Sequence, residues 1–186
     1  MQPQNTHDMQ ADIARVLISR ERIARRIDEL ARQIADAYRL SAEGIVIVPI
    51  LAGSLIFVSD LIRRLPVKAQ IRVLLASSYT GTSGSEPQIL YGPGQQVRGR
   101  DVLIVDDILD SGRTLQAVVA DLSRHEPRSL RSCVLLRKPG KAPPGVRVDF
   151  VGFDIEDVFV IGYGLDFNSY YRNWPDIAVL RPELYR

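Results

Sequence analysis

Residues 102–115 read VLIVDDILDSGRTL, a run of large apolar residues followed by acids and then by small residues. A short, continuous apolar run is typical of a strand that is buried on both faces of a parallel sheet. We predict a strand over 102–105 and a helix from Arg113 to about Ser123. Because ligands of open α/β sheets bind at the carboxyl ends of the strands, residues 106–115 are the first candidate site.

Helix and strand patterns alternate on both sides of this stretch. Apolar residues recur at spacings of three and four from Ile23 to Ile34, which predicts an amphipathic helix that Ser19 caps and that ends near Tyr38. We expect further strands at 15–18, 44–51, 71–75, 147–153 and 158–162. Residues 80–98 are rich in glycine and proline and predict a functional loop. The fold class is therefore α/β, with a central, mainly parallel sheet flanked by helices.

Length and composition indicate one domain. The chain has 186 residues, of which 46% are hydrophobic and 25% charged, enough to bury one core. We expect a flexible tail over 1–12 and a single domain over 13–186. No apolar run approaches the roughly 20 residues that span a bilayer, so we expect no membrane partner.

Charge and cysteine content indicate which partners and which cellular compartment to expect. Lysine and arginine number 24 against 22 acidic residues, and this net charge of +2 gives no reason to expect a nucleic-acid partner. The one cysteine, Cys133, cannot form an internal disulfide, and its apolar neighbours indicate a buried strand. A reducing compartment fits, so we expect a cytoplasmic protein.

The residues after the central strand suit a sugar phosphate. Backbone amides of Ser111 to Leu115 open a helix, where Gly112 permits close approach, and can surround a phosphate. The hydroxyls of Ser111 and Thr114 add donors, while Asp106 and Asp107 can accept from vicinal hydroxyls. A bare pair of aspartates is as often an acidic surface turn, but the full fourteen-residue pattern favours a ribose phosphate.

This pattern resembles the signature of type I phosphoribosyltransferases, and the chain from about residue 15 onward resembles their hypoxanthine-guanine branch. The resemblance implies that Asp106 and Asp107 hold the ribose hydroxyls and that Asp110 accepts a proton near the purine N7. It implies a 5-phosphate site made of Asp110, Ser111, Gly112, Arg113, Thr114 and Leu115. The family usually has Glu-Asp where this chain has Asp106-Asp107, so the shorter Asp106 is the departure.

Two further loops resemble parts of the same family. Leu51, Ala52 and Gly53 resemble its pyrophosphate loop, in which many relatives carry a lysine or arginine at the position of Ala52. Arg172 resembles a residue that contacts pyrophosphate and would compensate for that missing charge. Ser78-Tyr79 resembles the start of a mobile lid that excludes water from the reacting sugar.

The base-binding residues lie downstream. A flat purine needs an aromatic face, which Phe159 supplies, and its exocyclic carbonyl needs a cationic donor, which Lys138 supplies. By resemblance, Val160 reads the ring edge through its backbone, Leu165 closes the apolar side, and Asp166 lies near the purine edge or a magnesium-bound water. The implied fold has a core over about 40–137 and a hood subdomain built from about 13–20 and 138–186.

The resemblance implies an enzyme that transfers the phosphoribosyl group of phosphoribosyl pyrophosphate to N9 of a 6-oxopurine. It implies Mg²⁺ as cofactor, held mostly indirectly through substrate and water near Asp166, Asp106 and Asp107. It also implies a homodimer or homotetramer. The choice among hypoxanthine, guanine and xanthine stays open here.

Three other classes of protein fit this sequence less well. A regulator that binds nucleotides or RNA is disfavoured by the intact Asp110 and by the absence of a basic stretch. An enzyme for adenine or a pyrimidine is disfavoured because Lys138 suits a carbonyl rather than an amino group. A dinucleotide-binding domain is disfavoured because no Gly-x-Gly-x-x-Gly follows a strand.

Overall fold

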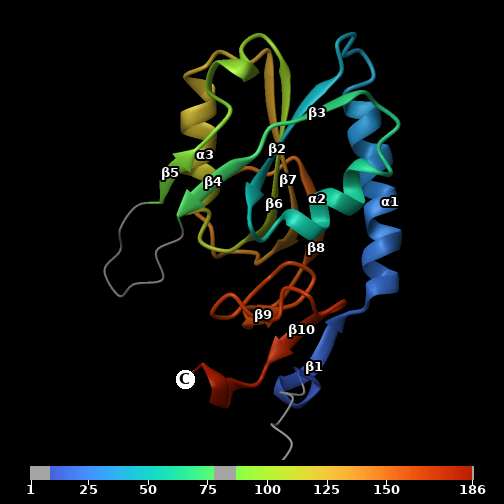
Figure 1. Ribbon diagram of the computed structural model, residues 1–186, viewed down its shortest axis with the longest axis vertical. Helices are drawn as coiled ribbons and strands as arrows, with labels where there is room; N and C mark the ends of the chain where they lie inside the picture. The colour runs from blue at the N-terminus through green and yellow to red at the C-terminus, as the bar shows by residue number, and fades with distance from the viewer. Residues whose placement is uncertain (1–8, 78–86, 186) are drawn as a thin grey trace, which may run out of the picture.

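The main body of the protein is a twisted sheet whose strands are mostly parallel (Figure 1). The computed structural model describes residues 9–77 and 87–185. The sheet has the order β5-β4-β2-β6-β7-β8, and β3 also pairs with β2. Its strands are β2 (Ile45–Leu51), β3 (Ala69–Ile71), β4 (Leu74–Ser77), β5 (Gln88–Tyr91), β6 (Asp101–Leu109), β7 (Ser129–Arg137) and β8 (Phe150–Asp154). Only the β4–β5 pair in this sheet is antiparallel.

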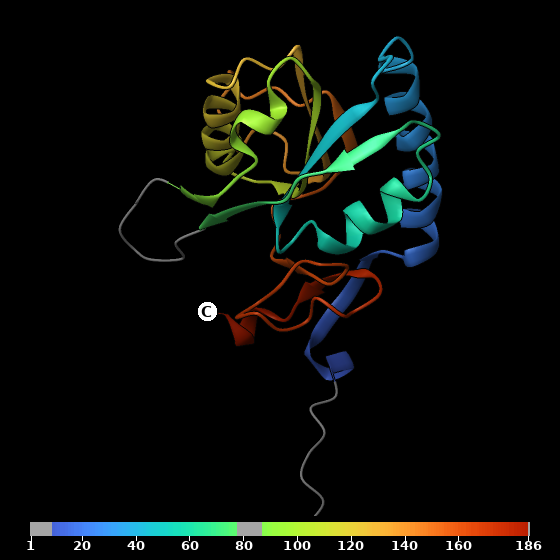
Figure 2. The same cartoon turned by 45° about the horizontal axis from the view of Figure 1, so that its top comes forward.

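Helices cover both faces of this sheet, as Figure 2 shows. Helices α1 (Arg20–Ala37) and α2 (Leu55–Ile62) pack on one face, and α3 (Arg113–Ser123) packs on the other. Side chains alternate along each strand, so Leu103 and Val105 of β6 face α1 and α2, while Val102 and Ile104 face α3. The central strands β2, β6 and β7 are buried on both faces, which explains their continuous apolar sequences.

A smaller antiparallel sheet lies across the carboxyl ends of the main strands (Figure 1). It has the order β1-β10-β9 and contains β1 (Ile13–Ile18), β9 (Val160–Ile161) and β10 (Ile177–Leu180). Segments from the two ends of the chain thus meet in one sheet. The backbone N–H of Arg20 donates to Asp176 Oδ1 at 2.8 Å and ties the start of α1 to this sheet. The described part of the chain also contains three 3₁₀ turns: η1 (Met9–Asp12), η2 (Gly94–Val97) and η3 (Pro182–Leu184).

The structure confirms the α/β class and the mainly parallel central sheet, and it corrects two strands. The strand predicted over 102–105 continues to Leu109, because Asp106 pairs with Val134 and Ile108 with Leu136 in the ladder with β7. Asp106 and Asp107 therefore belong to the strand instead of following it. The strand predicted over 71–75 is divided between β3 and β4, which pair with successive parts of β2.

Three other expectations change at loops. Within the predicted loop 80–98, residues 88–91 form β5 and 94–97 form η2, while 80–86 lie outside the described residues. Of the two strands predicted within the expected hood segment, β9 lies in the small sheet, whereas β8 joins the main sheet beside β7. The segment 138–186 is thus divided between both sheets. Residues 1–8 of the predicted tail lie outside the described residues, and 9–12 form η1.

Strand β10 was missed by the sequence analysis, although its four residues are all apolar and buried. Across residues 9–77 and 87–185, no helix is both long enough and apolar enough to cross a membrane.

Candidate active site

A cavity of about 350 Å³ lies where the carboxyl ends of β2 and β6 meet the small sheet. Its lining comes from five separated parts of the chain: the end of β2, Ala76 of β4, the stretch from Asp106 into α3, Lys138, and residues within 159–172. Except for Arg113, every predicted site residue within the described part of the chain lines it. The predicted lid residues Ser78 and Tyr79 lie outside the described residues. Residues far apart in sequence therefore meet around one space of ligand size.

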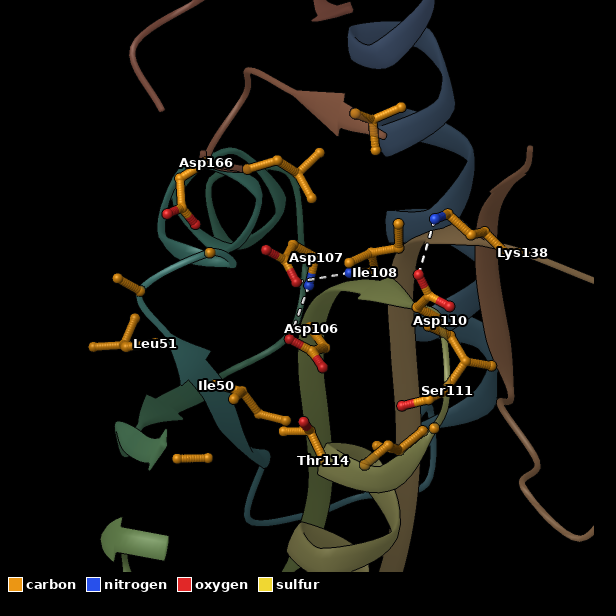
Figure 3. Close-up of a pocket in the computed structure, with 18 of the residues that line it drawn as sticks. Ile50, Leu51, Asp106, Asp107, Ile108, Asp110, Ser111, Thr114, Lys138 and Asp166 are labelled. Carbon is orange, nitrogen blue, oxygen red and sulfur yellow. Dashed lines mark hydrogen bonds and ion pairs between the residues drawn. The ribbon is translucent and has the colours of Figure 1, made fainter. Parts of the chain in front are cut away.

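Two carboxylates at the end of β6 define the middle of the cavity (Figure 3). The backbone N–H of Asp107 donates to Asp106 Oδ1 at 3.0 Å, and the N–H of Ile108 donates to Asp107 Oδ1 at 2.8 Å. Burial raises the pKa of both carboxyls, and for Asp106 the charge of Asp107 raises the pKa further. No salt bridge joins either carboxylate among residues 9–77 and 87–185. Unpaired carboxylates of this kind favour a ligand with hydroxyl donors or a cation.

The pyrophosphate-loop candidate contacts these carboxylates directly. A Cβ at Gly53 would overlap the Asp107 carboxylate, so only glycine fits between the end of β2 and β6. Leu51 and Ala52 also line the cavity, beside Gly53. The sequence prediction that these residues share a site with Asp107 agrees with this geometry.

The small-residue turn before α3 forms another wall. Gly112 has φ +75°, a left-handed conformation that glycine adopts without strain, and it precedes the first residue of α3. A Cβ at Gly112 would also lie 3.0 Å from Ala142 Cβ. Ser111 and Thr114 line the cavity here, whereas the exposed Arg113 does not. The Arg113 side chain thus does not line the cavity, while its backbone N–H, on which the predicted phosphate contact depends, belongs to the first residue of α3.

Asp110 and Lys138, predicted as proton acceptor and carbonyl donor, contact each other. Lys138 Nζ lies 2.8 Å from Asp110 Oδ2, and Figure 3 marks this contact with a dashed line. The backbone N–H of Lys138 donates to Leu109 O at 3.0 Å, which fixes the lysine beside the end of β6. The Lys138 side chain is only 9% exposed, while that of Asp110 is 43% exposed. A buried ammonium and an accessible carboxylate therefore stand together at the cavity.

Two charged residues near this pair were not predicted from the sequence. Asp157 Oδ1 lies 3.2 Å from Lys138 Nζ, and Asp157 Oδ2 lies 2.7 Å from Lys141 Nζ. Lys141 Nζ also lies 3.9 Å from Asp110 Oδ1. Both residues sit in loops without periodic patterns, so no sequence signal distinguished them from ordinary surface charges.

Aromatic residues support the predicted purine platform. The Phe159 ring stacks on Tyr185, with centroids 4.9 Å apart, and meets Phe167 edge to face at 5.6 Å. Phe159, Val160 and Leu165 line the cavity, whereas Tyr185 and Phe167 do not. The platform is thus held from outside the cavity.

The loop that carries Leu165 and Asp166 is held against the pyrophosphate-loop candidate. A Cβ at Gly164 would overlap the carbonyl oxygen of Gly53, so the two loops touch. Arg172 donates to Gly164 O at 2.6 Å and pairs with Asp166 Oδ1 at 2.7 Å. The predicted pyrophosphate contact and the predicted purine-edge carboxylate therefore form an ion pair with each other.

Another contact missed by the sequence analysis joins this loop to α2. The hydroxyl of Tyr163 donates to Asp60 Oδ2, and Asp60 also pairs with Arg63 and Arg64. Burial raises the pKa of Tyr163, and its hydrogen bond to the Asp60 carboxylate raises it further. This contact joins the loop that carries Leu165 and Asp166 to α2, the helix that follows the pyrophosphate-loop candidate.

The residues that line this cavity suit a phosphorylated ribose at the carboxyl edge of a parallel sheet, and comparison with known families points to the same class of protein. Residues 17–168 match the model of the phosphoribosyl transferase domain. The chain therefore belongs to the phosphoribosyltransferase family.

Curated relatives name a branch of that family. The chain is 42% identical over 181 residues to the hypoxanthine-guanine phosphoribosyltransferase of Mycobacterium avium, covering 94% of this chain and 89% of the relative. It is 44% identical over 165 residues to the hypoxanthine phosphoribosyltransferase of Escherichia coli K12, covering 88% and 93%. A crystal structure of a hypoxanthine phosphoribosyltransferase from Staphylococcus aureus superposes with a TM-score of 0.89 at 36% identity, over 98% of this chain and 100% of that one.

Proposed function

We propose that this protein transfers the 5-phosphoribosyl group of phosphoribosyl pyrophosphate to N9 of hypoxanthine, guanine or both, with Mg²⁺ as cofactor, in purine salvage. The observation that carries the proposal is the cavity itself. One space of about 350 Å³ is lined by two carboxylates that form no salt bridge, by a turn suited to phosphate, and by an aromatic side chain and a lysine. Curated relatives that share 42–44% identity are named for the same transfer.

Different groups of cavity residues bind different parts of the two substrates. The backbone amides of Ser111 to Leu115 and the hydroxyls of Ser111 and Thr114 hold the 5-phosphate at the start of α3, and Asp106 and Asp107 hold the ribose hydroxyls. The pyrophosphate lies against Leu51, Ala52 and Gly53, with Arg172 as the nearby cation. Lys138 donates to the purine carbonyl, the Phe159 ring stacks on the base, and Val160, Leu165 and Asp166 surround its edge.

The proposed reaction exchanges one bond for another at the anomeric carbon. The bond from C1′ to N9 forms as the bond from C1′ to the pyrophosphate oxygen breaks, and the electron pair leaves with the pyrophosphate. The proton displaced from the purine passes to the Asp110 carboxylate, which is accessible from the cavity. Orientation of the two substrates and charge stabilisation supply most of the acceleration.

The metal would come with the substrate. Among the described residues, no three histidine, cysteine or acidic side chains gather to hold a metal ion. The Asp106 and Asp107 carboxylates, which form no salt bridge, nevertheless fit a cation held through ribose hydroxyls and water, and Asp166 lines the same cavity. Mg²⁺ bound there would neutralise the departing pyrophosphate.

Turnover with defined bases tests the proposal. The protein is incubated with phosphoribosyl pyrophosphate, Mg²⁺ and each of hypoxanthine, guanine, xanthine, adenine and uracil, and nucleotide formation is followed. Product with hypoxanthine or guanine that disappears on chelation supports both the reaction and the cofactor. Activity that survives chelation removes the cofactor proposal alone, and no product with any base overturns the reaction.

We also propose a cytoplasmic homodimer or homotetramer. Exposed apolar side chains near the start of α2 support self-association, since Leu55 is 54% exposed and Ile56 is 38% exposed. Light scattering on the purified protein gives the mass directly, and a monomer at micromolar concentration would contradict this assembly.

A further inference from the structure

Four charged side chains of alternating sign form a closed ring at the purine end of the cavity. Lys138 Nζ lies 2.8 Å from Asp110 Oδ2 and 3.2 Å from Asp157 Oδ1. Lys141 Nζ lies 2.7 Å from Asp157 Oδ2 and 3.9 Å from Asp110 Oδ1. Each carboxylate thus faces both ammonium groups, and each ammonium faces both carboxylates.

The ring explains how an almost buried ammonium is tolerated at this position. With a side chain only 9% exposed, Lys138 has lost most of its hydration, and burying a charge is costly unless it is paired. Asp157 provides a second counter-ion besides Asp110. An ammonium has three donors, and within the described part of the chain the Lys138 ammonium forms ion pairs with these two carboxylates. One donor is therefore available to a ligand carbonyl.

Asp110 is the nearest carboxylate to the Lys138 ammonium, so any change in this ion pair alters the surroundings of the proposed proton acceptor. A carboxylate that is tightly paired with a cation is a weaker base. Asp157 shares the same ammonium and so weakens this pairing. Lys141 acts in the opposite sense, because it binds Asp157 and also lies near Asp110.

We propose that Asp157 and Lys141 are positioning residues that set how strongly Lys138 is held to Asp110, and thereby how readily Asp110 accepts the purine proton. The proposal rests on the proposed function for its consequence in turnover. The charge coupling itself does not, since it is a property of the unliganded ring. Neither Asp157 nor Lys141 lines the cavity, so neither is expected to touch the substrates.

The ring predicts opposite effects from removing its two outer charges. In Asp157→Asn a negative neighbour of Asp110 is lost, so the carboxyl releases its proton at lower pH. In Lys141→Gln a positive neighbour is lost, so the carboxyl releases its proton at higher pH. For charges at this separation and exposure we expect shifts of about 0.3 to 0.7 pH units in each direction.

Other charged groups are the same in every variant. Asp106, Asp107, Asp166 and Arg172 also line the cavity and face the ligand space, and both substitutions leave them unchanged. A matched control is Asp154→Asn: Asp154 is three residues from Asp157, is half exposed, and pairs with Arg137 instead of the ring. This control should not shift the Asp110 titration.

The first measurement needs no substrate. The side-chain carboxyl of Asp110 is followed by carbon NMR as a function of pH in the wild-type protein, Asp157→Asn, Lys141→Gln and Asp154→Asn. Opposite shifts in the two ring variants support the proposal. Shifts of the same sign, or none, overturn it, because a residue with a merely structural role would not produce effects that follow the sign of the charge removed.

The second measurement is the acid limb of single-turnover nucleotide formation in the same four proteins. If the acid limb of the pH–rate profile shifts in each variant in the same direction as the NMR titration of Asp110, the four charged side chains also influence the reaction. Opposite NMR shifts without turnover in the wild-type protein would leave the ring standing and defeat the proposed function. Turnover in the wild-type protein, with the same Asp110 titration in all four proteins, would defeat the ring proposal and leave the proposed function standing.

Discussion

The two ends of strand β6 carry aspartates in opposite electrostatic situations. At the amino end, Asp101 accepts from Arg128 Nε at 3.0 Å and from Ser129 Oγ at 2.7 Å, and the hydrogen bonds from Arg128 hold its pKa well below the usual range. At the carboxyl end, burial raises the pKa of Asp106 and Asp107. One strand therefore carries a compensated charge, which stabilises the fold, and uncompensated charges, which lower stability until a ligand compensates them.

The largest effect on turnover is expected at Asp110, whose charged side chain is proposed to meet the reacting purine. Asp110→Asn removes the proposed proton acceptor and keeps the shape, so we expect kcat to fall by about 10² to 10⁴-fold with the melting temperature within a few degrees of wild type. Single-turnover kinetics with hypoxanthine, together with thermal melting, measure both quantities. A variant that keeps full turnover would remove Asp110 from the proton-transfer role.

Asp106→Asn separates binding from folding at the same end of the strand. The amide keeps an oxygen that can accept from the N–H of Asp107, but it carries no buried charge, so the free protein should melt at an equal or higher temperature. We expect the KM for phosphoribosyl pyrophosphate to rise roughly 10-fold, because a charged acceptor for ribose hydroxyls is lost. An Asp106→Asn protein that melts well below wild type would contradict the view of this carboxylate as uncompensated.

Asp101→Asn makes the opposite prediction at the other end of the strand. We expect the free energy of unfolding at pH 7 to fall by about 2 kcal/mol, since two charge-assisted hydrogen bonds from Arg128 are weakened, with kcat unchanged. A lowered pKa in the folded state contributes stability above the unfolded pKa and loses it as pH falls. The difference from wild type should therefore shrink below about pH 4. Urea unfolding between pH 3 and pH 7 measures it, and a difference independent of pH would refute the charge argument.

How much of this was visible in the sequence differs between parts of the molecule. The strand-to-helix stretch from Asp106 to Leu115 was predicted because its chemistry lies in consecutive residues, whose spacing fixes their placement at the sheet edge. The division of 71–75 into two strands was not predicted, because it depends on where each segment pairs with β2. The contacts of Asp157 with Lys138 and of Tyr163 with Asp60 join segments that are separated in sequence, and no periodic pattern marks either partner.

The smallest expected effect comes from the backbone of the small-residue turn before α3. A matched pair of glycines separates its effect on substrate binding from its effect on stability. Gly112 has φ +75° and Gly140 has φ +79°, so alanine strains the backbone similarly at both, by about 1 kcal/mol. An added Cβ would meet Ala142 and Val146 at Gly112, but nothing within 4 Å at Gly140. We therefore expect both variants to lose similar stability from strain, and only Gly112→Ala to raise the KM for phosphoribosyl pyrophosphate, by about 3- to 10-fold. Equal KM values in the two variants would mean that the turn contributes to folding alone, and that the carboxyl end of β6 binds its ligand through side chains without this backbone.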